Sequence, residues 1–438
     1  PTLAQDQGVN CIALCTRRSF CSPLFEMGAR TSQCFEDEPV SAHTVKPVSE
    51  PEEDWVWDLL REDEPVSAHT VKPVSAVEES VSSNASDTKE LLLKQVPNNR
   101  TYKGLEYENQ GIWKKPFFFV QMADTQFGML GGGTRGLGEE EAMCNVAVDH
   151  INRLKPAFAI VCGDMTNSYP ENSSTPLFFH DQQSNAEKDA FQRVFSRVDE
   201  SIPLLCVCGN HDIGDRPNSK TLNIYKKRWG DDYYSFWFGG VKFLVINTQV
   251  YKALEKEPYA EDLLRMRKAQ DEWLEKELKA TEEENPAHLV ILSHVPPYIE
   301  APDEEDGYFN LHPTTRQELV TKCKAKGASK WFCGHYHRNS CACDADGKFE
   351  VVVTGAVGCN FKTRPGSNRK ARVELAGEGQ MFFTPEMSGF RIVKMRQDSI
   401  DHRFHCLSDM PANVDASALR WEESSDSVSN EVLRKWSI

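Results

Sequence analysis

Six short apolar runs, each ending in a polar or ionisable residue, constrain the fold of this 438-residue chain more than any other feature. Runs of this length, rich in β-branched and aromatic residues and separated by longer segments, are typical of buried strands in α/β proteins. The runs are "PFFFVQMAD", "FAIVCGD", "PLLCVCGN", "VKFLVIN", "HLVILSH" and "SKWFCGH". Open α/β sheets bind ligands at the carboxyl ends of their strands, so the closing residues of these runs are candidates for a functional site.

Four segments between these runs have the apolar spacing of amphipathic helices. We predict helices over Glu139–Leu154, Ala186–Val198, Glu261–Ala280 and Thr314–Lys326. The third has a broad apolar stripe, which packing against the core explains better than binding to a partner. The segment Tyr233–Gln249 predicts a β-hairpin that turns at Gly239 and Gly240.

The first hundred residues have a different composition from the rest. The segment "EDEPVSAHTVKPVS" at residues 36–49 recurs letter for letter at residues 62–75, within an acidic stretch rich in Ser and Pro. Repeats that pack on one another normally diverge, so this composition predicts a largely disordered extension over residues 1–100. A short cluster at Trp55, Trp57, Leu59 and Leu60 is a candidate for docking on a partner, but an incidental apolar cluster is the favoured explanation.

Charge and hydropathy exclude several classes of partner. The formal net charge is −16, which argues against nucleic acid or an anionic membrane surface as the main partner. No stretch approaches the roughly 18 to 20 apolar residues of a membrane span, and the N-terminus lacks the pattern of a signal peptide. Several cysteines lie inside the predicted strands, as free thiols do in a reducing compartment. We therefore expect a cytoplasmic protein without a membrane span.

Five strand ends carry residue types that bind metal ions. Each has an ordinary explanation when taken singly, since an Asp after a strand is often a helix cap and a lone His is usually a core or loop residue. Together they form a mixed oxygen and nitrogen set that suits divalent transition metals or manganese. A carboxylate shared by two cations about 3.5 to 4 Å apart would let hydroxide form at neutral pH. The residues are Asp124, Asp164, Asn210, His211, Asp212, His294, His335 and His337.

The motifs "GDMTN", "GNHD", "SHVPP" and "GHYH", in this order after the Asp-x-Gln of Asp124–Gln126, resemble the calcineurin-like metallophosphoesterase superfamily. The similarity covers roughly residues 113–406. It implies an α/β fold of two packed mixed β-sheets flanked by helices, with a binuclear metal site at the strand ends. Residues 113–406 would then be the catalytic domain, and residues 407–438 a C-terminal tail that could be helical.

The resemblance also implies roles for single residues. Asp124 and His337 would hold the first of two divalent cations (Mn, Mg, Fe or Zn), Asp164 would bridge both, and the second would be held by Asn210, His294 and His335. His211 would protonate the leaving oxygen. Asp212 would orient His211 and raise its basicity.

Gln126 departs from this family pattern, which has histidine at that position. An amide oxygen is a weaker, neutral ligand than an imidazole nitrogen. We therefore expect a weaker first metal site that prefers a harder cation such as Mn²⁺ or Mg²⁺, with Gln126 binding it directly or through water.

The resemblance implies hydrolysis of phosphomonoesters by a metal-bridging hydroxide, in a serine/threonine-protein phosphatase that acts on a phosphorylated kinase or other signalling protein. Two alternatives stay open, a phosphodiesterase or nucleotide hydrolase and a non-catalytic scaffold, although an intact His211 and Asp212 favour catalysis. Arg135 and Arg338 are candidates for binding the substrate phosphate. The candidate walls of the cleft are residues 128–136, Asn167–Asn185 and Glu300–Tyr308.

Overall fold

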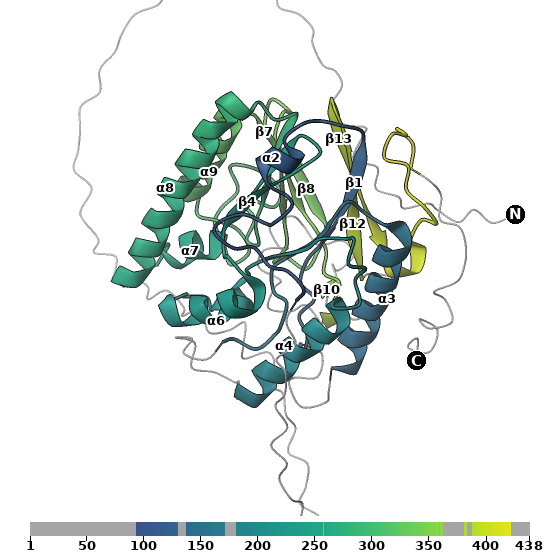
Figure 1. Cartoon of the computed structure of the whole chain (residues 1–438). Coiled ribbons are helices and arrows are strands. Elements are labelled where there is room, and N and C mark those ends of the chain that lie inside the picture. Colours follow the sequence, from purple (N-terminus) through teal and green to yellow (C-terminus); the bar gives the residue numbers. More distant parts are fainter. Residues whose placement is uncertain are drawn as a thin grey trace, which may run out of the picture. The chain divides into compact units, whose positions relative to one another are not determined.

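The computed structural model describes residues 93–129, 137–170, 181–256, 258–358, 360–361, 381–382 and 388–421. These residues all belong to one structural unit, made of residues 79–369 and 379–438, and the other unit lies outside the described part of the chain. Two mixed β-sheets pack face to face, and helices cover their outer faces (Figure 1). This is the α/β architecture expected from the sequence.

The first sheet has the strand order β13-β12-β1-β2-β3. Strands β1, β2 and β3 are parallel neighbours, while β12 pairs with β1 and β13 with β12 in antiparallel fashion. Their bounds are β1 (Phe117–Met122), β2 (Ala159–Cys162), β3 (Leu204–Val207), β12 (Gly389–Arg396) and β13 (Ser399–Cys406). The sequence predicted the first three of these strands but neither β12 nor β13.

The second sheet has the order β4-β5-β6-β7-β9-β8, with parallel inner strands and antiparallel strands at both edges. The predicted hairpin is confirmed: β4 and β5 are joined at Gly239 and Gly240, whose φ angles of 54° and 83° suit a tight turn between twisted strands. The strands are β4 (Tyr234–Phe238), β5 (Val241–Val245), β6 (His288–Leu292), β7 (Ala328–Cys333), β8 (Ser340–Cys343) and β9 (Glu350–Val353). A separate pair joins β10 (Asn360–Phe361) to β11 (Met381–Phe382).

All four predicted helices are present. They are α3 (Gly138–Leu154), α4 (Asp181–Phe195), α8 (Glu261–Glu284) and α9 (Pro313–Ala325). The sequence did not predict the shorter elements α2 (Tyr107–Gln110), α5 (Asn210–Ile213), α6 (Ser219–Trp229), α7 (Thr248–Ala253) and the 3₁₀ helix η2 (Leu407–Asp409). Helix α6 begins after Asn218, whose side chain accepts hydrogen bonds from the backbone N–H groups of Lys220 and Thr221.

Three hydrophobic layers follow from the alternation of side chains along the strands. Val120 and Met122 of β1 point away from the second sheet, into a core shared with α3, α4 and α6. Phe117 and Phe119 point the other way, into the core between the two sheets. The outer face of the second sheet packs on α8 and α9, which lie together on one side in Figure 1. The apolar stripe of α8 is therefore a core contact, as predicted.

The described part of the chain reaches slightly into the predicted terminal segments. Residues 1–92, including the duplicated segment, lie outside it, but Arg100 is described and its guanidinium pairs with Asp232 at 3.0 Å. Toward the other end, residues 407–421 continue beyond β13, and the Trp421 ring lies 5.7 Å from the His405 ring. The described part of the chain therefore extends past the predicted boundaries at residues 100 and 407.

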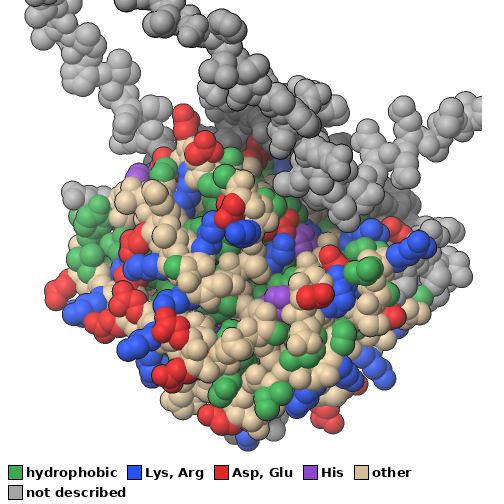
Figure 2. Space-filling model, turned by 90° about the horizontal axis from the view of Figure 1, so that it is seen from above, with side chains coloured by type: hydrophobic (Ala, Val, Ile, Leu, Met, Phe, Trp, Pro, Cys, Tyr) green, Lys and Arg blue, Asp and Glu red, His purple; other side chains and the backbone are tan. Residues whose placement is uncertain are grey.

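Two observations on the described residues concern possible partners. No helix among the described residues is long and apolar enough to cross a membrane. On the face shown in Figure 2, basic and acidic side chains are interspersed rather than gathered into areas of one sign. A nucleic-acid backbone binds to a continuous basic surface, so this face does not suit it.

Phe158 lies in the core between the two sheets. We expect Phe158→Ala to lower the free energy of unfolding by about 3 to 5 kcal/mol, because the substitution leaves a cavity there. Its ring stacks on Phe119 with 4.7 Å between centroids and contacts Phe236 and Phe243 edge-on at 5.2 Å. Chemical denaturation measures the change. The control is Leu264→Ala, at a residue that is 47% exposed, for which we expect less than about 0.5 kcal/mol. Equal effects of the two substitutions would contradict this description of the core.

Candidate metal centre

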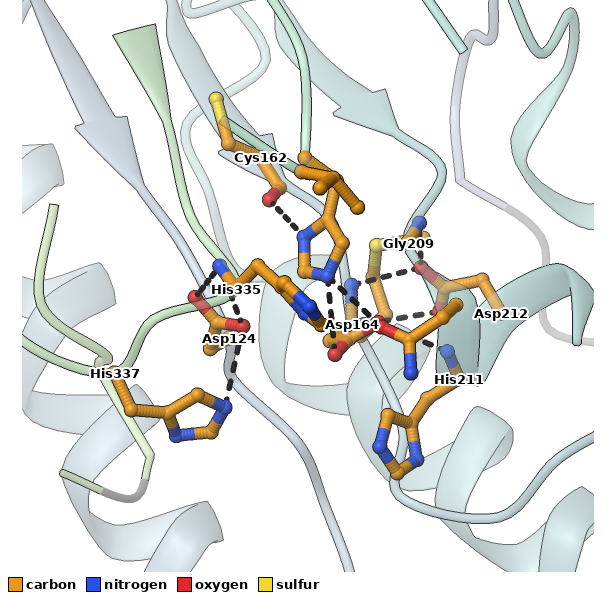
Figure 3. A network of polar contacts seen from close by, with 12 residues as sticks. Asp124, Cys162, Asp164, Gly209, His211, Asp212, His335 and His337 are labelled. Atoms are coloured by element: carbon orange, nitrogen blue, oxygen red, sulfur yellow. Dashed lines mark hydrogen bonds and ion pairs between the residues drawn. The ribbon is translucent and has the colours of Figure 1, made fainter. Parts of the chain in front are cut away.

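Six of the predicted metal ligands come together at one edge of the two sheets. Asp124 and Asp164 follow β1 and β2, and Asn210 begins α5 directly after β3. From the second sheet, His294 follows β6 and His335 follows β7. Figure 3 shows Asp124, Asp164, His335 and His337 turned toward one another. The strands of two different sheets thus deliver their terminal side chains to a single place, as the sequence predicted.

Two groups of side chains at this edge could each hold a metal ion. Asp124, Asp164 and His337 form the first group, and Asp164, His294 and His335 form the second. Within each group the ligand atoms lie within 4.8 Å of one another, and all five residues are buried. Asp164 belongs to both groups.

Two amide side chains, Gln126 and Asn210, are further candidates for oxygen ligands. The Gln126 side chain is 1% exposed, and its Oε1 has no hydrogen-bond partner within the described residues. A buried carbonyl oxygen without a partner costs free energy unless something binds it. Asn210 Oδ1 lies 3.2 Å from His294 Nε2, beside the second group. Both amides therefore suit the role of neutral oxygen ligands.

The histidines of the second group have a fixed orientation. His294 Nδ1 lies 2.8 Å from the Cys162 carbonyl oxygen, and His335 Nε2 lies 3.1 Å from that of Tyr308. A carbonyl only accepts, so each of these nitrogens carries a proton, and the other nitrogen of each ring is the one available to a metal ion. Histidine ligands of metal ions commonly have this arrangement.

Neighbouring charges shift the pKa values of the buried groups. Burial raises the pKa of Asp124 well above its usual range, and burial together with the charge of Asp164 raises the pKa of Asp212 to about 7. Burial opposes ionisation of Asp164, but the adjacent imidazoles of His294 and His211 lower its pKa. Burial also lowers the pKa of His294, but Asp164 more than offsets this and raises it to about 9. Buried carboxylates at this density need a compensating positive charge, and a divalent cation supplies one.

The backbone at the site has an uncommon conformation. Five site residues that are not glycine have φ angles between 40° and 69°: Asp124, Gln126, Asp164, His335 and His337. Such residues cost of order 1 kcal/mol or more each and persist only where the surroundings hold them. Here the backbone N–H of Gln126 donates to the Asp164 carbonyl oxygen at 2.9 Å, and that of His335 donates to the Asp124 carboxylate at 3.0 Å. At the site, the strain thus falls on residues that carry candidate ligands.

Glycines allow the close approach of the ligands. A β-carbon at Gly209 would lie 2.1 Å from Asp164 Oδ1, and one at Gly334 would lie 2.7 Å from Asp124 Oδ2. At both positions glycine is required because a side chain has no room there.

Asp212 differs from the expectation based on the resemblance. Its carboxylate accepts hydrogen bonds from the backbone N–H groups of Asp164 at 2.8 Å, Met165 at 3.0 Å and Gly209 at 2.7 Å. The His211 ring is held elsewhere, with Nδ1 against the Asn167 carbonyl oxygen. Asp212 therefore supports the backbone that carries Asp164, and its bonds in the described structure do not orient the His211 ring.

The two candidate arginines are placed differently. Arg338 lies beside His337, and its guanidinium stacks 4.9 Å from the centroid of the Tyr336 ring. Arg135 lies outside the described residues, as does most of the glycine-rich segment 128–136. Sequence reasoning did not single out three side chains near Asn210, namely Tyr169, Asp215 and Tyr308. No motif marks the two tyrosines, whereas Asp215 follows "GNHD" closely enough to have been considered.

A third group of possible ligands, Cys341, Glu350 and His402, does not fit a metal ion. The Arg391 guanidinium, which can only donate, lies 2.9 Å from His402 Nδ1, so the ring proton is on Nε2, which faces Glu350 at 3.1 Å. Glu350 also pairs with the Lys330 ammonium. Both imidazole nitrogens and the carboxylate are therefore engaged, and two cations already occupy the surroundings.

Comparison with known proteins identifies the family. Residues 119–339 match the model of the calcineurin-like phosphoesterases. The chain belongs to this family. Serine/threonine-protein phosphatase CPPED1 of Mus musculus is 34% identical over 324 residues, which cover 71% of this chain and 90% of the relative. The protein of the same name from Danio rerio is 34% identical over 322 residues, covering 71% and 92%. A solved dimetal phosphatase from Danio rerio is 14% identical, with a TM-score of 0.41 over 67% of this chain and 97% of that one.

These findings confirm the resemblance seen in the motifs. The chain is a hydrolase of the metallophosphoesterase type. Calcineurin-like phosphoesterases use divalent metals, and the ligand groups around Asp164 fit such ions in their donor atoms and their charge.

The lack of space around Gly209 allows a test of the site. We expect Gly209→Ala to weaken Mn²⁺ binding by about tenfold or more, because the added methyl group displaces the Asp164 carboxylate. Calorimetric titration of the chelator-treated protein measures the affinity. Gly138→Ala is the matched control, since a β-carbon at that position meets no atom within 4 Å. An unchanged Mn²⁺ affinity in Gly209→Ala would contradict the described approach of Gly209 to Asp164.

Proposed function

We propose that the chain is a two-metal phosphomonoesterase that acts on phosphoserine or phosphothreonine in proteins. The observation that carries this proposal is that two separate ligand groups share the carboxylate of Asp164. A shared carboxylate holds two cations close enough to act on one phosphoryl group.

The ligands divide between two cations. We assign Asp124, His337 and Gln126 to the first, and the unpartnered Oε1 of Gln126 supports a direct contact. The second falls to Asn210, His294 and His335, with Asp164 shared. Bound there, two divalent ions supply Lewis acidity toward the phosphoryl oxygens and lower the pKa of water. The first cation is proposed to be Mn²⁺ or Mg²⁺, because three of its four assigned ligands donate oxygen.

His211 is the proposed acid for the leaving oxygen. Its backbone N–H donates to Asp164 Oδ1 at 3.0 Å, which anchors the residue beside the shared carboxylate. The Asn167 carbonyl oxygen at Nδ1 keeps a proton on that nitrogen, so Nε2 is the nitrogen that gains and gives up the working proton. The Tyr169 ring stacks on the imidazole with 4.7 Å between centroids and limits its rotation.

The substrate assignment rests on the relatives. The mouse and zebrafish proteins are named serine/threonine-protein phosphatases, and we extend this activity to the present chain, with a phosphorylated signalling protein such as a kinase as the substrate class. Arg338 beside His337 is the proposed contact to substrate phosphate. The cysteines described as free thiols suit a reducing compartment, and we propose a cytoplasmic location.

The proposal is tested by turnover of the Mn²⁺-loaded full chain on p-nitrophenyl phosphate and a phosphoserine peptide. We expect hydrolysis of both, and we expect His211→Ala to lower kcat by about 10²- to 10⁴-fold with the Mn²⁺ content unchanged, because only proton transfer is lost. The control is His150→Ala, at a histidine of α3 that contacts the Leu407 carbonyl oxygen away from the site. Faster hydrolysis of bis-p-nitrophenyl phosphate than of either monoester would contradict a monoesterase.

Gln126 generates a separate prediction. We expect Gln126→His to bind Zn²⁺ at the first site about tenfold more tightly and to lose the preference for Mn²⁺, because imidazole is the better ligand for zinc. Competition between Mn²⁺ and Zn²⁺, followed by metal analysis, measures the preference. Gln192→His is the control, since Gln192 is equally buried but lies on α4. If metal preference and stoichiometry stay the same, Gln126 is not a ligand.

A further inference from the structure

The amide of Asn210 is held from both sides. Its Nδ2 lies 3.1 Å from Asp215 Oδ1, 3.2 Å from the Tyr308 hydroxyl and 3.3 Å from the Tyr169 hydroxyl. Its Oδ1 faces His294 Nε2 at 3.2 Å. A flip of the amide would set its oxygen against the Asp215 carboxylate, and two acceptors repel. The surroundings therefore keep the oxygen of Asn210 directed toward the second ligand group.

Asp215 forms hydrogen bonds with both Asn210 and Tyr169. Its second carboxylate oxygen, Oδ2, accepts a hydrogen bond from the Tyr169 hydroxyl at 3.0 Å, so both oxygens are engaged on the Asn210 side. Its backbone carbonyl oxygen accepts from Gln249 Nε2 of α7 at 2.8 Å. A hydrogen bond from an amide to a charged carboxylate is stronger than one to a neutral acceptor. Asp215 is thus the strongest of the three restraints on the amide.

Tyr308 lies on the loop between β6 and α9, and side chains of α7 and α9 hold this loop in place. The buried guanidinium of Arg316 donates to the carbonyl oxygens of Pro302, Glu304 and Leu311. The Lys252 ammonium donates to those of Gly307 and Asn310, at 2.7 Å and 2.9 Å, on either side of Tyr308.

The carboxylate of Glu304 secures the first part of the same loop, because it accepts from the backbone N–H groups of Ile299 at 2.8 Å, Glu300 at 2.7 Å and Ala301 at 3.1 Å. The backbone of Tyr308 is therefore held in place before any ligand binds. From this position its hydroxyl reaches Asn210 and its carbonyl oxygen reaches His335 Nε2 at 3.1 Å.

We propose that Asp215, Tyr169 and Tyr308 are positioning residues that set the affinity of the second metal site by fixing the ligand atoms of Asn210 and His335. The inference rests on the proposed function, since it takes Asn210 and His335 as metal ligands. Partners behind a metal ligand typically change metal affinity by about 10- to 100-fold when they are removed. Here one carboxylate and one loop residue act on two ligands from different sheets.

Mn²⁺ titration of the chelator-treated full chain tests this proposal. Asp215→Asn is expected to weaken one of two Mn²⁺ sites by about 10- to 100-fold and to leave the other unchanged. Tyr308→Phe removes only the hydroxyl and is expected to weaken the same site by about three- to tenfold. Tyr298→Phe is the matched control: that hydroxyl is buried, has no hydrogen-bond partner within the described residues and does not touch Asn210. Circular dichroism of each variant checks the fold.

A second pair of variants carries Asn210→Asp, with and without Asp215→Asn. This comparison distinguishes a positioning role of Asp215 from a general disturbance of the fold. A carboxylate offers an oxygen in either orientation, and it would repel the nearby Asp215 carboxylate. In this background Asp215→Asn is expected to strengthen Mn²⁺ binding instead of weakening it. A purely structural role of Asp215 would instead give the same loss in both backgrounds.

The proposal is overturned if Asp215→Asn and Tyr308→Phe both bind two Mn²⁺ ions as tightly as the unaltered chain, or if Asp215→Asn causes the same loss in both backgrounds. In either case the proposed function stands as long as the unaltered chain binds two Mn²⁺ ions and hydrolyses p-nitrophenyl phosphate. If the unaltered chain binds no Mn²⁺, the proposed function and the positioning role both fail.

Discussion

The packing of the two sheets on each other is the constraint on which the rest of the structure depends. Asp124, Asp164 and Asn210 come from the first sheet, and His294 and His335 from the second, so neither sheet contains a complete ligand group. The aromatic layer between the sheets fixes their relative position, with Phe119 of β1 edge-on to Phe243 and Phe332 at 5.6 Å and 5.9 Å. Aromatic rings packed at such angles resist sliding, because their preferred geometry is directional. A rigid core thereby sets distances at the edge of the sandwich.

Three buried carboxylates lie at that edge, and neighbouring groups compensate their charge. Asp124, Asp164 and Asp212 are each at most 2% exposed, and a carboxylate loses much of its hydration when buried. Asp212 is compensated by three backbone N–H groups, while Asp124 and Asp164 face imidazoles. The latter two carboxylates are thus the ones poised to accept a cation. Hydrogen bonds that are made before a ligand arrives reduce the reorganisation that binding requires.

The sequence predicted most of the architecture because most strands are continuous apolar runs. Strands β12 and β13 were missed because charged residues interrupt them: Lys394 and Arg391 on β12 are buried, but their polar ends reach the Arg420 carbonyl oxygen and the Thr354 hydroxyl. These hydrogen-bond partners come from other parts of the chain, so the local sequence does not predict that a Lys or Arg side chain is buried. The candidate metal ligands could be named from the sequence because they follow strands within recognisable motifs. Tyr308 was named only as the end of a candidate wall, because its part depends on a loop geometry that only the fold reveals.

The position of β12 has a consequence for the order of folding. It pairs along β1, with Phe117 opposite Met395, and so places a strand from near the end of the described chain next to the central strand of the first sheet. During synthesis β1 emerges almost the whole domain earlier than its partner, and at about 5 to 20 residues per second its open edge waits for many seconds. An exposed edge of apolar backbone is prone to pairing with other chains. Pairing of β12 with β1 therefore covers an aggregation-prone edge only after most of the described chain has been synthesised.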